Sequence, residues 1–112
     1  MRINKITYSG GMINNKSEKQ KLNKLVFNED QIPKAISKII EETKIYEIGG
    51  IYGDEKVGYP IQYDKLQIEY DNKKTIIEAF NITIFMVYAE DPYIKRVFKV
   101  LVQFQIIAKQ NK

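Results

Sequence analysis

The side chains of this chain that could do acid–base or nucleophilic chemistry are its carboxylates, because its 112 residues include no histidine and no cysteine. Histidine is the usual general base near neutral pH. Cysteine is the strongest ready nucleophile and the main soft-metal ligand. Their joint absence excludes zinc sites, thiol chemistry and Ser-His-Asp triads.

The acidic residues do not have the spacing of a catalytic pair. Two groups of them cluster in the sequence, namely Glu41, Glu42, Glu47, Asp54 and Glu55, and then Glu90 and Asp91. A glycosidase holds two carboxylates at a fixed separation across a sugar, and nothing in either group fixes such a pair. Glu90-Asp91 before Pro92 is typical of a helix start, and Glu41-Glu42 of a solvated face. The sequence therefore predicts no catalytic residue and no enzyme.

Metal and cofactor sites are also not predicted. The Asp/Asn spacing of an EF-hand loop is absent, and Asp54-Glu55 is typical of a solvent-facing turn. The glycines in residues 49–53 lack the P-loop spacing and the Lys-Ser/Thr that follows it. Turns with positive φ explain these glycines better.

Tyrosine is the residue type that favours a binding role. Of the eight tyrosines, Tyr46, Tyr52, Tyr59 and Tyr63 lie in or beside residues 49–63, a stretch rich in glycine. Tyr and Gly together suit a recognition surface, since rigid amphipathic rings lose little entropy on an adaptable backbone. The alternative is that half of these rings pack onto a sheet. We take Tyr52 and Tyr59 as candidate partner-binding residues.

The net charge of +4 is unevenly distributed. Residues 1–24 hold six basic side chains against one acidic one, residues 25–94 hold seven against thirteen, and residues 95–112 hold five against none. A self-compensating, solvated surface is the simplest interpretation. If the two basic ends meet in the fold, they would form a basic patch suited to a polyanion, so a nucleic-acid-associated domain is the alternative hypothesis.

The first half of the chain predicts two strands and a helix. Residues 2–8 have β-branched and aromatic character, and Ser9-Gly10-Gly11 is expected to end this strand and begin a polar loop through Asn15. Residues 19–27 form the second predicted strand. Isoleucines and an alanine at helical spacing from Ile32 to Ile40 predict an amphipathic helix ending near Thr43, capped by Asn28 or Asp30.

The second half predicts a hairpin and a final helix. Residues 44–48 suggest a short strand, and residues 49–60 a long loop. Residues 64–70 and 75–84 alternate around a polar turn at 71–74, with Ile76, Glu78, Phe80, Ile82 and Ile84 in one register. Asp91-Pro92 starts the last helix, although residues 99–107 also fit a strand. These elements predict one α+β domain, residues 1–112: a four-stranded antiparallel sheet with two helices on one face, in the order strand-strand-helix-strand-strand-helix.

The N-terminal segment resembles a known family. At residues 6–12, Ile-Thr-Tyr-Ser-Gly-Gly-Met, the chain resembles the emfourins, small protein inhibitors of thermolysin-like metallopeptidases that open with a strand running into Ser-Gly-Gly. The element order is also similar. Tyr8 and Met12 depart from the Arg and Phe usual in the family. The resemblance implies an inhibitor with its contact surface at Ser9, Gly10, Gly11, Met12 and Ile13.

Taken together, these features predict a non-enzymatic protein-binding domain, with a protease inhibitor acting by steric occlusion as its specific form. A homodimeric structural module using spare apolar surface on the last segment is a further alternative. Neither a secretion signal nor a run of about 20 apolar residues is present. The chain is therefore predicted to be soluble and cytoplasmic, without cofactor or metal.

Overall fold

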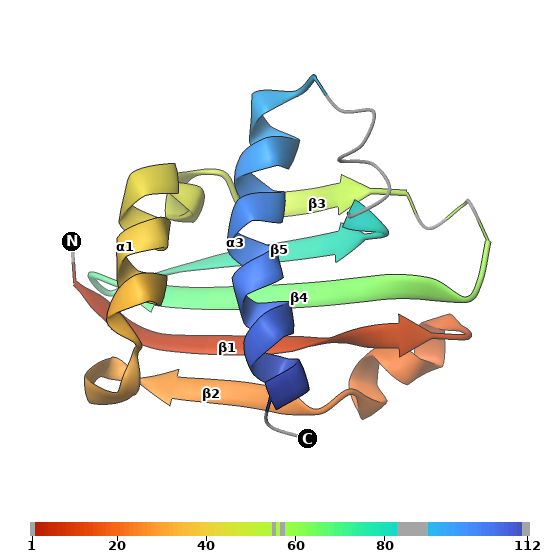
Figure 1. Ribbon diagram of the computed structural model, residues 1–112, viewed down its shortest axis with the longest axis horizontal. Coiled ribbons are helices and arrows are strands. Elements are labelled where there is room, and N and C mark those ends of the chain that lie inside the picture. Colours follow the sequence, from red (N-terminus) through yellow and green to blue (C-terminus); the bar gives the residue numbers. More distant parts are fainter. Residues whose placement is uncertain (1, 55, 57, 83–89, 111–112) are drawn as a thin grey trace.

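A computed structural model describes residues 2–54, 56, 58–82 and 90–110 (Figure 1). Five strands form one mixed sheet in the order β2-β1-β4-β5-β3. The strands are β1 (Ile3–Ile13), β2 (Lys24–Asn28), β3 (Gly50–Gly53), β4 (Ile61–Tyr70) and β5 (Lys73–Phe80). The helices are α1 (Lys34–Thr43) and α3 (Pro92–Gln110), with 3-10 turns η1 (Lys16–Lys21), η2 (Glu29–Gln31) and η3 (Ile45–Glu47).

The predicted four-stranded antiparallel sheet is wrong, because β3 adds a fifth strand that runs parallel to β5. The sequence does not reveal β3, since four residues with a glycine at each end show no alternation. Gly53, at φ +82°, lies so close to β5 that a Cβ there would be 2.9 Å from the carbonyl carbon of Phe80. Only glycine allows the two backbones to approach in this way.

The expected break at Ser9-Gly10-Gly11 is also wrong, because β1 continues to Ile13. Ser9, Gly10 and Gly11 pair with Lys65, Asp64 and Tyr63 of β4 in an antiparallel ladder. Long-range pairing therefore overrides the local turn preference of this sequence. The second predicted strand begins later than expected, since η1 occupies part of residues 19–27 and β2 starts at Lys24.

The two helices in the described part of the chain lie on one face of the sheet. Both α1 and α3 cover the same face (Figure 1), and Ile36 and Ile40 of α1 share a buried core with Val97 and Leu101 of α3. The Asp91 carboxylate accepts a hydrogen bond from the Tyr93 backbone N–H at 2.8 Å, as expected of a helix cap. Helix α3 spans residues 99–107, which rules out the strand alternative there.

Two local predictions about the connections change. The first helix begins after Pro33 rather than after Asn28 or Asp30, because η2 intervenes. Residues 44–48 contain the 3-10 turn η3 (Ile45–Glu47) instead of a strand. Lys44 adopts left-handed φ and ψ of 53° and 36° at the end of α1, which reverses the chain direction before η3.

The hairpin β4–β5 is tighter than expected. Its turn consists of Asp71 and Asn72, both with positive φ, in place of a four-residue turn. Ile77 of β5 faces the helices and is buried, whereas Ile76 lies on the opposite face and is 39% exposed. The predicted extension of this strand to Ile84 lies outside the described residues.

The two faces of the sheet carry separate apolar clusters. The main core lies between the sheet and the helices. The second cluster lies on the other face, because Tyr63 and Asp64 are neighbours on one strand and point to opposite sides. It consists of Ile13, Ile61, Tyr63 and Phe80, with Leu22 against it. The Lys19 ammonium lies 5.2 Å from the Tyr63 ring centroid, a cation–π distance.

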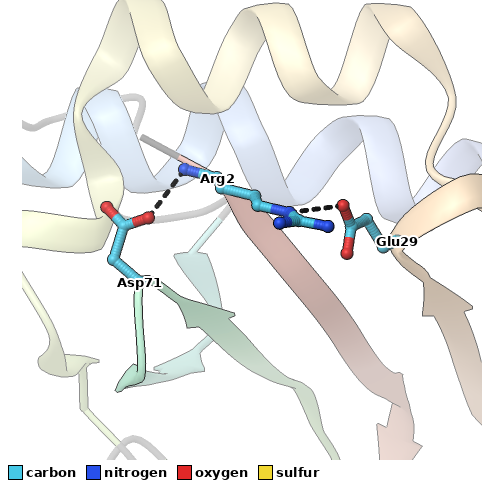
Figure 2. A network of polar contacts seen from close by, with 3 residues as sticks. All are labelled: Arg2, Glu29 and Asp71. Atoms are coloured by element: carbon cyan, nitrogen blue, oxygen red, sulfur yellow. Dashed lines mark hydrogen bonds and ion pairs between the residues drawn. The ribbon is translucent and has the colours of Figure 1, made fainter.

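Polar contacts fix the start of β1 (Figure 2). The Arg2 guanidinium donates to the Glu29 carboxylate at 2.6 Å, and the Arg2 backbone N–H donates to Asp71 at 2.9 Å. The hydrogen bond from Arg2 lowers the pKa of Glu29 below its ordinary value. Arg2 is thus tied to the end of β2 and to the hairpin turn.

Within the described part of the chain, neither helix has the length and the apolar character of a membrane-spanning segment.

Candidate functional site

A buried carboxylate lies at the centre of the candidate site. Asp64 of β4 has no solvent exposure. It accepts hydrogen bonds from the Tyr8 hydroxyl, from the Gln105 amide at 3.1 and 3.2 Å, and from the Gln62 amide at 3.4 Å. These groups come from β1, β4 and α3, so the cluster joins both central strands to the last helix.

Burial dominates the electrostatics of this cluster. All the groups donating to Asp64 are neutral, and burial raises the pKa of its carboxyl even though the Tyr8, Gln105 and Gln62 hydrogen bonds lower it. Burial and the Asp64 charge together raise the pKa of Tyr8, so its hydroxyl remains a donor at physiological pH. The polar groups therefore hold one another in a fixed arrangement.

The register of β1 against β4 builds this cluster. Gly10 is the direct partner of Asp64, and Tyr8 points to the same face two residues earlier. A Cβ on Gly10 would lie 2.7 Å from the Tyr8 ring and 2.8 Å from the Asp64 carboxylate, both shorter than real contacts. The Tyr8–Asp64 pair therefore requires a glycine at position 10. The turn expected from the sequence is not the reason for this glycine.

A groove runs along the surface beside the cluster. To one side of α3, the helices leave the C-terminal end of β1 and the N-terminal end of β4 uncovered (Figure 1). Two adjoining cavities of about 220 and 590 Å³ share Tyr8, Gly10, Gly11 and Ala108, and we call their union the β1–α3 groove. One wall is lined by Met12, Gln62, Gln105 and Lys109. The opposite wall is lined by Lys21, Leu22, Asn23, Lys24 and Leu25.

The structure separates the residues of the predicted N-terminal contact surface. Gly10, Gly11 and Met12 line the groove, and the Met12 side chain is 60% exposed. Ser9 and Ile13 are buried, and Ile13 belongs to the second apolar cluster. The expected contact loop is therefore part of strand β1, and three consecutive residues of it border the groove between buried Ser9 and buried Ile13.

The predicted tyrosine surface does not form one site. Tyr52 lies on the edge strand β3, packs partly against the main core, and donates a hydrogen bond to the Ile48 carbonyl. Tyr59 lies in the connection before β4 and does not line the groove. Tyr63 is buried and donates to Glu78 at 3.1 Å. Packing onto the sheet, the alternative interpretation, thus accounts for Tyr52 and Tyr63.

Sequence reasoning missed Asp64, Gln62 and the three groove lysines. A signal for Asp64 was present, because it shares the buried register of Leu66 and Ile68, where a charged residue is out of place. Gln105 gives the same signal on the apolar face of α3. No local sequence pattern indicates Lys21, Lys24 and Lys109, because they line one groove only through the position at which α3 ends.

Asp64 gives a testable pH dependence. Its pKa in the fold lies above its ordinary value of 3.8, so the folded protein keeps a proton that the unfolded chain releases. The contribution of the protonated carboxyl to the free energy of unfolding is at its maximum at pH values below 3.8. This contribution decreases as the pH rises through the raised pKa. The Asp64→Asn variant has no ionisable group at this position, so its stability does not show this decrease.

Urea unfolding of wild type and Asp64→Asn from pH 3.5 upward measures this effect. The stability of wild type relative to the variant should decrease as pH rises. If the stability of wild type relative to the variant does not change, or increases, as the pH rises, the raised pKa of Asp64 would be contradicted.

Comparison with family models, with curated proteins and with solved structures found no match. The resemblance to emfourins therefore stays a prediction. Within the described residues, no three acidic side chains are placed together to hold a metal ion. Of the acidic loop pair, Asp54 is exposed, and Glu55 lies outside the described residues.

Proposed function

We propose that this chain is a non-enzymatic protein-binding domain that contacts its partner through the β1–α3 groove. The observation that carries the proposal is the groove itself, which is lined by Gly10 and Gly11 and has exposed Met12 on one wall. A large exposed apolar side chain beside a concave surface is typical of an interaction site.

The construction of the groove also supports a binding role. Tyr8, Gln62 and Gln105 line it, but their polar groups are held by Asp64. A surface on such a fixed base loses little conformational entropy when a partner binds. Met12 adds adaptability, since its unbranched side chain fits irregular partner surfaces.

Inhibition of a protease is the specific form of this proposal. It rests on the resemblance to emfourins at Ser9-Gly10-Gly11, two of whose residues line the groove. The domain would act by steric occlusion, with the ends of β1 and β4 covering the entrance to the active site. No chemical step on the inhibitor is needed for this mechanism.

Met12→Asp tests the proposal, with Ile51→Asp as its matched control. Both residues are exposed apolar side chains on strands, at 60% and 71%, but Ile51 lies on the edge strand β3. If the domain inhibits a thermolysin-like peptidase, Met12→Asp should weaken inhibition by about tenfold or more, as expected for a central interface residue. Ile51→Asp should inhibit like wild type.

Inhibition constants for several thermolysin-like peptidases provide the measurement. Equal inhibition by Met12→Asp and wild type would place the contact surface elsewhere. No inhibition by wild type at micromolar concentrations, across all the peptidases, would remove the inhibitor form of the proposal.

A further inference from the structure

We infer that the β1–α3 groove receives an acidic segment of a partner protein; this inference rests on the proposed function. Lysines line both cavities of the groove: Lys21 and Lys24 line the one beside β2, and Lys109 lines the one beside α3. Lys24 also lines a smaller cavity together with Ser9, its partner on β1. Lys21 and Lys24 come from the basic N-terminal stretch, and Lys109 from the basic C-terminal one. The fold thus brings parts of the two basic ends together across one concavity.

The three lysines are available for a partner. Each is exposed, and none forms an ion pair or hydrogen bond with another residue in the described part of the chain. Arg2 differs, because Glu29 already neutralises it (Figure 2). The groove lysines therefore carry the unsatisfied positive charge of this surface.

No carboxylate on the groove surface offsets these lysines. Neither cavity has an acidic residue in its lining. Asp64 lies beneath the floor, fully buried and held by three neutral donors. Glu18 is the only acidic residue among residues 1–24, and its carboxylate accepts the Asn14 backbone N–H at 2.6 Å. A concave surface lined by one sign of charge concentrates its field on ligands of the opposite sign.

The floor between the lysines suits a peptide chain. Gly10 and Gly11 line it, and the space over Gly10 is filled by the Tyr8 ring and the Asp64 carboxylate, which gives the groove a closed floor. Met12 and Ala108 add apolar surface on which a partner side chain can rest. The arrangement fits a segment with an apolar residue on the floor and carboxylates toward the lysines on either side.

A protein segment fits this surface better than a nucleic acid does. Proteins that hold single strands combine basic side chains with exposed aromatic rings on which bases stack. The one aromatic ring in the groove lining belongs to Tyr8, which is buried and stacked on Phe104 with ring centroids 5.3 Å apart. No arginine lines either cavity, so bidentate phosphate contacts are also missing from the described groove.

Fluorescence anisotropy with defined probes tests the inference. The probe is a short labelled peptide with glutamates on both sides of a single leucine. Its glutamine analogue tests the need for charge, and a labelled single-stranded oligonucleotide of the same net charge tests the nucleic-acid alternative. Lys21→Glu/Lys24→Glu/Lys109→Glu removes the groove charge. Lys34→Glu/Lys73→Glu/Lys95→Glu changes the net charge equally at exposed positions outside the groove.

We expect the acidic peptide to bind more tightly than its glutamine analogue and the oligonucleotide, with an affinity that decreases as salt is added. The groove variant should weaken peptide binding by about tenfold or more, and the control variant should weaken it several-fold less. Should the groove variant fail to fold, Lys109→Gln replaces it and should weaken binding about two- to fivefold.

Three results would overturn the inference: no binding of the acidic peptide by wild type, equal weakening by the groove and control variants, or tighter binding of the oligonucleotide. These results are distinguishable from failure of the proposed function. A native partner that wild type retains and Met12→Asp loses would leave the groove as a protein-binding surface whose partner segment is not acidic.

Discussion

Gly10→Ala is expected to lower the free energy of unfolding by about 3 kcal/mol, the cost of overpacking a core and breaking a buried hydrogen-bonded pair. The added methyl group would lie 2.7 Å from the Tyr8 ring and 2.8 Å from the Asp64 carboxylate. Both neighbours are fixed by β1–β4 pairing and by Phe104, so neither can move away cheaply. Urea denaturation monitored by circular dichroism measures the loss.

Two comparisons separate this clash from a general effect of replacing glycine. Gly50→Ala adds its methyl group into open space at φ +139°, so only backbone strain of about 1 kcal/mol is expected. Tyr8→Phe removes the hydroxyl that the Gly10 methyl would strike, so the double variant should lose less stability than the sum of the single losses. Additive losses, or a Gly10→Ala cost no larger than that of Gly50→Ala, would contradict the packing described for Tyr8 and Asp64.

Phe104→Ala is expected to cost about 4 kcal/mol, within the range for truncating a fully buried phenylalanine. Phe104 has no solvent exposure, stacks on Tyr8, and lies 6.3 Å from the Phe27 ring of β2 by centroids. It therefore holds the C-terminal half of α3 on β1 and β2. Urea denaturation gives the overall cost, and amide hydrogen exchange should show faster exchange in α3 than in β4.

Ile106→Ala is the control on the same helix. Ile106 is 47% exposed, so its truncation should cost under about 0.5 kcal/mol and leave exchange in α3 unchanged. A Phe104→Ala cost close to that of Ile106→Ala would show that α3 does not depend on this ring. Of the apolar residues on which the homodimer alternative rests, Val100 is buried within one chain and Ile106 is exposed.

The parts of the fold that could be predicted are those with strong local periodicity. Helix α1 follows from apolar residues at 3.6-residue spacing, and α3 from the Asp91-Pro92 start. The hairpin follows from alternation. The failures come from long-range effects: Ser9-Gly10-Gly11 has the composition of a turn, yet pairs with β4 along its whole length. Strand β3 was not recognised because its pairing with β5, and no local pattern, defines it.

The candidate site was predictable only in part, for a related reason. The Gly10-Gly11-Met12 segment follows from a family resemblance, and in the structure these residues line the groove. The buried Asp64 is detectable in the sequence as a charged residue in an apolar register. The lysines on the two walls are 85 or more residues apart in the sequence, so only the path of α3 across the sheet brings them together.

The measurement that most directly tests the central claim, that the β1–α3 groove binds a protein partner, is quantitative affinity capture from native lysate. Wild type, Met12→Asp and Ile51→Asp serve as baits, and mass spectrometry compares the proteins retained. The groove account predicts at least one protein that wild type and Ile51→Asp retain equally and that Met12→Asp loses. Identical retention by all three baits, or loss with Ile51→Asp alone, would contradict it.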